Sequence, residues 1–251
     1  MDAATTGPGA GGSITLRLRR AGIARGIAMA AHARLDVWNR LLATRLLPTL
    51  PASDTSVTLA GARGLAAGGA ALVEFLHRGD AALATWCAVV PELRRARPEL
   101  IVGVGSIVDA PTAALYLAHG ADFVVSPQLD EEVARLCHRR KVAWIPGCGT
   151  VSEIGRAEAL GAEIVKLFPA AALDGAEFIR SLHGPQPWSR LMLTGNAVPF
   201  DERRVRELIA AGACALSMGP ALADPALLRA RDEAALATRT RQVLAWLSSG
   251  S

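Results

Sequence analysis

Several patterns that would assign a function at once are missing from this sequence of 251 residues. The cysteines at positions 87, 137, 148 and 214 form no C-x-x-C pair, which argues against a zinc or redox-motif site. No apolar run reaches the ~18 residues of a membrane span, because Arg, Asp or Gly interrupts every candidate. No G-x-G-x-x-G opens a predicted helix, so the dinucleotide fingerprint is also missing. We expect a soluble cytoplasmic protein with reduced thiols.

Net positive charge is confined to the first 40 residues. The formal net charge is +4, and residues 1–40 hold six arginines against Asp2 and Asp36, which accounts for all of it (6 − 2 = +4). Nucleic-acid binding favours a clustered basic face with aromatic platforms, whereas only 4% of these residues are aromatic. We expect neither a nucleic acid nor a membrane among the partners.

The first 34 residues differ in composition from the rest. Residues 1–13 are mostly Gly, Ala and Thr, and residues 14–34 are rich in arginine and lack acids. This pattern loosely resembles a transit peptide, but serine is sparse; a start site placed too early, with Met29 nearer the true beginning, is an equal alternative. We treat residues 1–34 as a flexible or mis-started extension and residues 35–251 as one domain.

Strand and helix patterns alternate through that domain. A short amphipathic helix comes first, with Leu35, Trp38, Leu41 and Leu42 at helical spacing. Strand-like segments follow at 45–50, 70–76, 100–105, 122–126, 142–146, 163–168, 191–194 and 213–218. Helical segments lie at 57–67, 80–97, 110–119, 130–140, 151–160, 175–182 and 202–211, with a last one within 224–247. Eight such units in about 200 residues predict an α/β fold, a (β/α)8 TIM barrel whose one end the first helix plugs. An open doubly wound sheet is the alternative.

Lysine is nearly missing as well: of the 27 Lys and Arg residues, only Lys141 and Lys166 are lysine. Lys166 lies inside a β-branched and aromatic run that predicts a buried strand. Burying an ammonium group costs several kcal/mol unless it is paired or deprotonated. Arginine cannot lose a proton to attack a carbonyl, whereas a desolvated lysine is a Schiff-base nucleophile. The alternative is a lysine that extends its ammonium group to the strand end.

Barrel geometry brings the carboxyl ends of the strands together at one mouth. There the sequence places an amine nucleophile, a carboxylate, a guanidinium group, hydroxyls and small-residue loops. These residues are Glu74, Arg78, Ser106, Ser126, Pro127, Lys166, Thr194, Gly195 and Gly219. As alternatives, Glu74 and Arg78 could form a salt bridge at the rim, or Arg78 could be a surface arginine. His77 points to the opposite face, and we expect it to pack.

Six segments, in order, resemble the 2-keto-3-deoxy-6-phosphogluconate (KDPG) and 4-hydroxy-2-oxoglutarate (KHG) aldolases. They are Val73-Glu-Phe-Leu-His-Arg78, Gly103-Val-Gly-Ser106, Ser126-Pro127, Ile145-Pro-Gly-Cys-Gly-Thr-Val-Ser-Glu153, Val165-Lys-Leu-Phe-Pro169 and Thr194-Gly195. The K-x-F-P strand and the I-P-G-x-x-T-x-S-E segment together are specific, whereas either alone would be weak. The resemblance covers the chain from about residue 35 to its end.

The resemblance implies a homotrimeric class I aldolase that needs no metal or other cofactor. Such an enzyme, a lyase, cleaves a 2-keto-4-hydroxy acid to pyruvate and an aldehyde, glyceraldehyde 3-phosphate or glyoxylate. Lys166 would form the Schiff base and Glu74 would shuttle protons. Arg78 would bind the pyruvate carboxylate, assisted by Ser106 and by amides near Ser126 and Pro127. The distal end of the substrate would lie near Thr194, Gly195 and Gly219, whose residual amides would hold a phosphate.

Three positions depart from the family pattern. Asn196 stands where a second glycine is usual after the seventh strand, and Pro220 stands where a serine is usual after the eighth. Proline offers neither a hydroxyl nor an amide proton. Gln128 is a further change near the mouth. We therefore expect weak use of phosphorylated substrate, and two alternatives stay open: an aldolase of unphosphorylated 2-keto acids, or a non-catalytic binding barrel.

Overall fold

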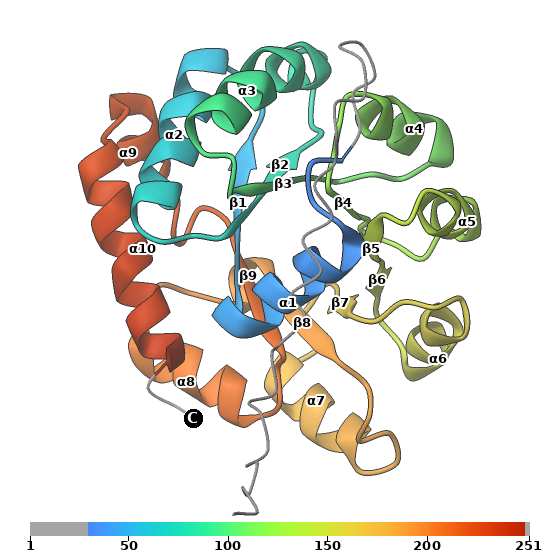
Figure 1. Ribbon diagram of the computed structural model, residues 1–251. Helices are drawn as coiled ribbons and strands as arrows, with labels where there is room; N and C mark the ends of the chain where they lie inside the picture. The colour runs from blue at the N-terminus through green and yellow to red at the C-terminus, as the bar shows by residue number, and fades with distance from the viewer. Residues whose placement is uncertain (1–29, 249–251) are drawn as a thin grey trace, which may run out of the picture.

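A computed structural model describes residues 30–248, which form a closed ring of parallel strands surrounded by helices (Figure 1). The strands are β1 (Leu46–Pro51), β2 (Leu72–Leu76), β3 (Ile101–Gly105), β4 (Phe123–Val125), β5 (Ala143–Ile145), β6 (Gly147–Cys148), β7 (Val165–Leu167), β8 (Leu191–Thr194) and β9 (Ala215–Met218). The helices are α1 (Arg34–Thr44), α2 (Thr55–Ala67), α3 (Ala82–Ala96), α4 (Ala110–Ala118), α5 (Glu131–Arg139), α6 (Val151–Ala159), α7 (Gly175–His183), α8 (Glu202–Ala210), α9 (Pro225–Ala230) and α10 (Glu233–Ser248), with a 3-10 turn, η1 (Gly195–Ala197).

The barrel closes through its fifth strand, which Pro146 divides into β5 and β6. The strand order is β5-β4-β3-β2-β1-β9-β8-β7-β6, and β5 pairs with β4 while β6 pairs with β7. Proline has no N–H to donate, but its carbonyl accepts a hydrogen bond from the Lys166 amide at 2.8 Å. This strand therefore runs two residues beyond the predicted segment 142–146. The TIM barrel is confirmed, and the open sheet is excluded.

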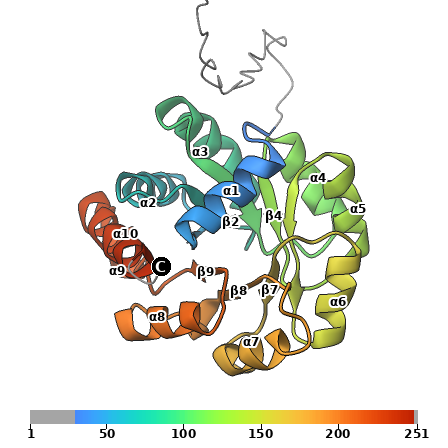
Figure 2. The same ribbon diagram turned by 60° about the horizontal axis from the view of Figure 1, so that its bottom comes forward.

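Helix α1 plugs the end of the barrel where the strands begin, as predicted. Val37, Trp38 and Leu41 are buried there against the inward-facing first layer of strand side chains. That layer comprises Leu47, Leu72, Ile101, Phe123, Ala143, Ile164, Met192 and Ala215. Figure 2 shows α1 lying across this end. Leu35, which the sequence pattern placed on the apolar face, is 71% exposed, because the packed face begins at Val37.

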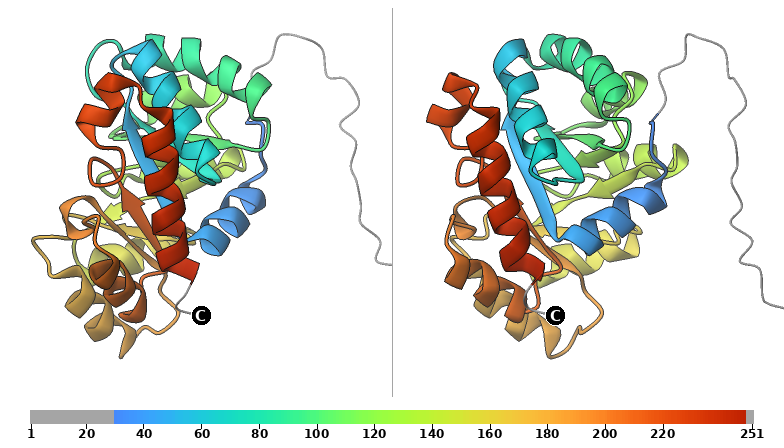
Figure 3. Two further views of the ribbon diagram at one scale, coloured as in Figure 1. Left: turned by 90° about the vertical axis from the view of Figure 1, so that its left-hand side faces the viewer. Right: turned by 60° about the vertical axis from the view of Figure 1, so that its left-hand side comes forward.

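The predicted last helix is two helices, α9 and α10. Arg231 ends α9 in the left-handed conformation at φ 54°, and α10 begins two residues later. Figure 3 shows α10 running along α2. The two helices approach closely because α2 presents Gly64 towards α10, where a Cβ would lie 2.9 Å from the Glu233 carbonyl oxygen. No helix in residues 30–248 is long and apolar enough to cross a membrane.

Capping side chains fix where most of the helices start after the strands end. The N-cap side chain accepts a backbone hydrogen bond in α2, α4, α5, α6, α8 and α9; these caps are Asp54, Asp109, Asp130, Thr150, Asp201 and Asp224. Such caps satisfy amides that the helix itself leaves unpaired. Most of the expected N-terminal extension, residues 1–34, lies outside the described residues, which begin at residue 30.

Candidate active site

Lys166 points into the barrel from the middle of β7. Its side chain shares a face with Ile164, which belongs to the interior cluster, because side chains alternate along a strand. Its Nζ lies 4.9 Å from the centroid of the Phe168 ring. Burial lowers the pKa of Lys166 below its ordinary 10.5; the Glu74 carboxylate acts in the opposite direction and Arg78 in the same direction. The amine is therefore easier to deprotonate than that of an exposed lysine.

Glu74 is buried on the interior face of β2, with only 2% of its surface exposed. Burial raises the pKa of its carboxyl group, and the nearby positive charges of Lys166 and Arg78 partly offset that shift. Space for the carboxyl group comes from Gly105 on β3, where any Cβ would overlap Glu74 Oε1. This carboxyl group, which burial drives towards its protonated form, thus shares the barrel interior with the lysine.

Arg78 and Ser106 are brought together at the mouth, as the sequence suggested. Arg78 Nε donates to Ser106 Oγ at 3.1 Å across the ends of β2 and β3. Ser106 adopts the left-handed conformation with φ 63°. Arg78 is exposed to solvent and also influences the pKa values of both Glu74 and Lys166. It can therefore contact an anionic group near those two side chains.

The segment after β4 holds Ser126 and Pro127, near which the sequence analysis predicted amides that assist carboxylate binding. Ser126 is fully buried, its N–H donates to the Ile145 carbonyl at 3.0 Å, and its hydroxyl accepts a 3.4 Å hydrogen bond from Trp144. Its side chain alternates with inward-facing Val125 and so points away from the mouth. Pro127 is on the inward face but has no amide hydrogen. Any amide that this segment offers must come from the next residue, Gln128.

Two polar side chains in the barrel interior were missed by the sequence analysis. Thr49 is the strand partner of Glu74, and Ser217 is the strand partner of Thr194. Both lie two residues after inward-facing positions, Leu47 and Ala215, so strand alternation was the signal that could have found them. They add hydroxyls to the ring of polar groups around Lys166.

The residues expected at the distal end line the same side of the mouth. Thr194 faces inward at the end of β8, and Gly195 follows with φ 71°. Gly219 is buried beside Thr49, whose Oγ1 would lie 2.8 Å from any Cβ added to that glycine. Two of the three departures from the family pattern, Asn196 and Pro220, lie here and are exposed.

The sequence matches a known protein family over most of its length. The family model "KDPG and KHG aldolase" matches residues 37–238. The chain belongs to this family.

Relatives with curated names are about one-third identical to this family member over the aligned residues. A 2-dehydro-3-deoxy-phosphogluconate aldolase of Pseudomonas aeruginosa is 33% identical over 163 residues, which is 65% of this chain and 71% of the relative. The KHG/KDPG aldolase of Escherichia coli (strain K12) is 32% identical over 142 residues, 57% of this chain and 65% of the relative.

A KDPG aldolase of Legionella pneumophila, solved with pyruvate captured as a covalent carbinolamine, superposes with a TM-score of 0.73. It is 21% identical and is covered to 96%, with 81% of this chain aligned, so it supports the fold.

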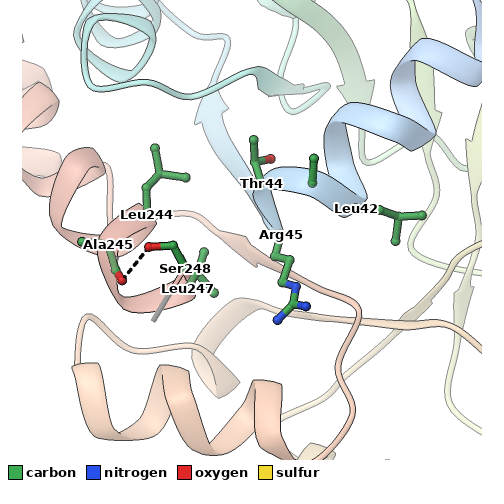
Figure 4. A pocket seen from close by; sticks show the side chains of 8 residues that line it. Leu42, Thr44, Arg45, Leu244, Ala245, Leu247 and Ser248 are labelled. Carbon is green, nitrogen blue, oxygen red and sulfur yellow. Dashed lines mark hydrogen bonds between the residues drawn. The ribbon is translucent and has the colours of Figure 1, made fainter. Parts of the chain in front are cut away.

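Two features of this aldolase family member lie outside the proposed chemistry. His77, expected to pack, lies 2.8 Å from the Tyr116 hydroxyl through its Nδ1 and packs edge-on against that ring. A cavity of about 660 Å³ lies at the end of the barrel where the strands begin, between the ends of α1 and α10 (Figure 4). Its walls are mainly Leu42, Thr44, Leu244, Leu247 and Arg45. Within residues 30–248, no group of three or more His, Cys, Asp or Glu side chains is placed to hold a metal ion.

Proposed function

We propose that this protein is a class I aldolase that cleaves a 2-keto-4-hydroxy acid to pyruvate and an aldehyde. The observation that carries the proposal is Lys166, an inward-facing lysine whose pKa is lowered by burial, in the same barrel interior as the buried carboxyl group of Glu74. Family membership supports it, because the relatives from Pseudomonas aeruginosa and Escherichia coli are both named as aldolases. Burying the Lys166 amine and the Glu74 carboxyl group costs free energy, and a non-catalytic barrel would not account for that cost.

The proposed reaction begins when the neutral Lys166 amine attacks the C2 ketone. The protonated Glu74 carboxyl group then gives its proton as water leaves, which forms a protonated imine and a Glu74 carboxylate. The imine draws electrons from the C3–C4 bond while Glu74 accepts the proton of the C4 hydroxyl. The C3–C4 bond breaks, the aldehyde departs and an enamine remains on the lysine. Protonation at C3 and hydrolysis then release pyruvate and restore the amine. The buried environment suits both groups, because it favours a neutral amine and a carboxyl group that can exchange protons.

The pyruvyl carboxylate would bind at Arg78. Its hydrogen bond to Ser106 holds the guanidinium group at the mouth, and its charge already acts on both Glu74 and Lys166. A guanidinium group can form paired charge-assisted hydrogen bonds with a carboxylate. We assign no role in this contact to the Ser126 side chain, because it points away from the mouth.

Family membership alone does not assign one substrate, because the relative from Escherichia coli is named for both KHG and KDPG. Pro220 and Asn196 favour an unphosphorylated substrate. Pro220 has no N–H or hydroxyl to donate to a phosphate, and Asn196 adds a side chain to the loop after β8 where the family pattern has glycine. A charge-assisted hydrogen bond to phosphate contributes about 1.5–3 kcal/mol, so each missing donor weakens phosphate binding measurably. We propose 2-keto-4-hydroxy acids without phosphate as the better substrates.

Borohydride trapping with pyruvate, followed by intact mass and peptide mapping, tests the proposal. We expect one pyruvyl adduct on Lys166, retained in Lys141→Arg and lost in Lys166→Ala. No adduct on protein shown to be folded would instead favour the binding barrel.

Replacing Glu74 with glutamine should lower kcat by about 10²- to 10⁴-fold, because a positioned acid/base contributes that much. The fold should persist, as circular dichroism would show. Glu99→Gln removes an exposed carboxylate as the matched control. A Glu74→Gln enzyme with normal kcat would assign the proton transfer to another group.

A further inference from the structure

A cavity of about 410 Å³ opens beside the proposed catalytic residues. It lies among the ends of β1, β2 and β9 and the starts of α2 and α9, and its polar inner wall includes Thr49 and Arg78. Thr49, which lines the cavity, is the strand partner of Glu74, so the cavity borders the strand position next to the one that holds the carboxyl group. Its volume is in the range of small-molecule pockets, about 300–1,000 Å³. The aldehyde end of the substrate can therefore extend into this cavity.

Most of the cavity wall is apolar. Seven of the residues that line it have side chains that cannot donate a hydrogen bond. They come from β1, β2, the loop after β9 and the helices α2 and α9, and they are Pro51, Val57, Leu76, Pro220, Ala223, Pro225 and Leu228. Leu228 and Ala223 are buried, and Leu76 and Val57 are half-buried, so a ligand here would cover apolar surface. Burying that surface favours a hydrocarbon chain over an ionic group.

The backbone amides that could bind an anion here already have partners. At the start of α2, Asp54 accepts from the Val57 amide at 2.8 Å, and at the start of α9, Asp224 accepts from the Ala226 amide at 2.7 Å. The Val57 hydrogen bond contributes most to lowering the pKa of Asp54, so this carboxylate is ionised. Helix starts that usually attract phosphate thus carry carboxylates instead.

The cations near the cavity do not create a strong anion site. Arg78 is hydrogen-bonded to Ser106 and is assigned to the pyruvyl carboxylate, while Arg229 is exposed at the outer rim opposite Asp54. In the neighbouring cleft beside Asn196, Arg204 is paired with Glu207 at 2.8 Å, and Asp174 lines the same cleft. A phosphate at either place would face a carboxylate.

We infer that the acceptor end of this site binds an uncharged aldehyde that carries a short apolar chain. The inference rests on the proposed function. In the synthetic direction, C3 of the pyruvyl enamine would attack the aldehyde carbon and form the C3–C4 bond. Glu74 would donate its proton to the new C4 oxygen, and water would hydrolyse the imine. Pyruvate and the aldehyde thus combine into a 4-hydroxy-2-keto acid with an apolar tail, with no oxidant or reductant.

A separate trapping experiment first establishes the pyruvate adduct on Lys166. Untreated enzyme is then used to measure kcat/KM for aldol addition of pyruvate to five aldehydes: ethanal, propanal, butanal, glyoxylate and glyceraldehyde 3-phosphate. We expect kcat/KM to rise about fourfold with each added methylene, the factor that burial of one such group supplies. Butanal should exceed both charged aldehydes by more than tenfold.

Two variants locate the effect in the cavity. Leu76→Asn should remove the rise with chain length, whereas Leu115→Asn, which changes an exposed leucine on α4, should keep it. Pro220→Ser adds a donor at the wall and should raise kcat/KM for glyceraldehyde 3-phosphate several-fold. Pro98→Ser, at an exposed proline before β3, is its matched control.

The outcomes separate this inference from the function on which it depends. An adduct on Lys166 together with a flat chain-length series overturns the inference and leaves the aldolase intact. So does a preference for glyceraldehyde 3-phosphate that falls in Arg229→Ala, because that pattern would make the cavity a phosphate site. Absence of any adduct overturns the proposed function and the inference with it.

Discussion

At the scale of single residues, one physical cause acts on both proposed catalytic groups. Burial lowers the pKa of Lys166 and raises that of Glu74, so desolvation moves each group towards its neutral form. Their mutual attraction opposes both shifts. Two groups whose pKa values converge in this way can exchange protons at moderate pH, which is what imine formation and C–C cleavage require.

The titration of Lys166 should respond in opposite directions to its two charged neighbours. Glu74→Gln removes the charge that raises the pKa of Lys166, so the pKa should fall further; Arg78→Gln removes a charge that lowers it, so the pKa should rise. Reductive ¹³C-methylation and NMR titration would measure this, with exposed Lys141 as an internal reference. Shifts in the same direction, or a wild-type value at or above 10.5, would contradict the argument.

Gly105 should be needed for the position of Glu74. A methyl group at residue 105 would occupy the space of the Glu74 carboxyl group, so Gly105→Ala should displace it. A misplacement of about 1 Å can cost on the order of 10²-fold in rate. Gly155→Ala is the control, because a Cβ there meets no atom within 4 Å and alanine is the better helix former. Equal turnover in the two variants would mean that Glu74 can move without loss.

At the scale of elements, the start of α6 explains part of the family motif. Thr150 Oγ1 accepts from the Glu153 amide at 3.2 Å, and Glu153 Oε2 accepts from the amides of Gly149 and Thr150 at 2.8 and 3.0 Å. This capping box fixes the loop after β6, whose Gly147 is the strand partner of Lys166. The Thr and Glu of the motif therefore shape the loop rather than react.

Loss of the capping box should lower stability by a modest amount. Thr150→Ala should cost about 1 kcal/mol in the free energy of unfolding, as for other N-caps. Thr238→Ala, at an exposed position inside α10, should be neutral or slightly stabilising. Urea unfolding measures both, and a similar loss in the two would mean that the cap contributes nothing specific.

The same box predicts a dependence on pH. Hydrogen bonds, first from the Gly149 amide, hold the pKa of Glu153 below its ordinary 4.5. A lowered pKa in the folded state stabilises above the unfolded value, and this contribution is lost as the pH falls through the folded value. Wild type should therefore be more stable than Glu153→Gln above pH 4.5, and the difference should fade at lower pH. A difference that persists there would point to packing instead.

At the scale of the whole molecule, the barrel has one end that holds the proposed catalytic residues and one end that α1 covers. The interior is filled near the strand starts by large apolar side chains and by α1, and it becomes polar towards the mouth. Gly103 illustrates the change: its missing side chain leaves room for the Phe123 ring, on which the polar layer rests. Substrate can enter only from the mouth, because α1 covers the other end.

The plug should contribute strongly to stability through its inner face alone. Leu41→Ala should cost about 2–5 kcal/mol, since it leaves a cavity at the barrel end. Leu35→Ala on the same helix should change stability by less than about 0.5 kcal/mol, because Leu35 is exposed. The midpoint of urea unfolding distinguishes them, and a small effect at Leu41 would show that the barrel tolerates an open end.

The homotrimer implied by the family resemblance stays a prediction, to be measured by light scattering.

The sequence by itself determined the fold class and led to the proposed chemistry. Eight alternating units specified the barrel, and a lysine inside an apolar strand, in a chain with only one other lysine, indicated the proposed nucleophile. Local patterns sufficed, because hydrophobic periodicity and the cost of burying an amine are properties of short segments. The predicted end of the fifth strand, at Pro146, was two residues short, since only pairing with β7 shows that the strand continues.

Only the tertiary structure decided which way side chains face and what surrounds the distal end. It turned Ser126 outward, added Thr49 and Ser217 to the interior, and placed the apolar residues of α2 and α9 around one cavity. Val57 and Leu228 are far apart in the sequence, and nothing in either helix indicates that they meet. Such contacts depend on barrel closure, which sets the register between strands and brings β1 beside β9.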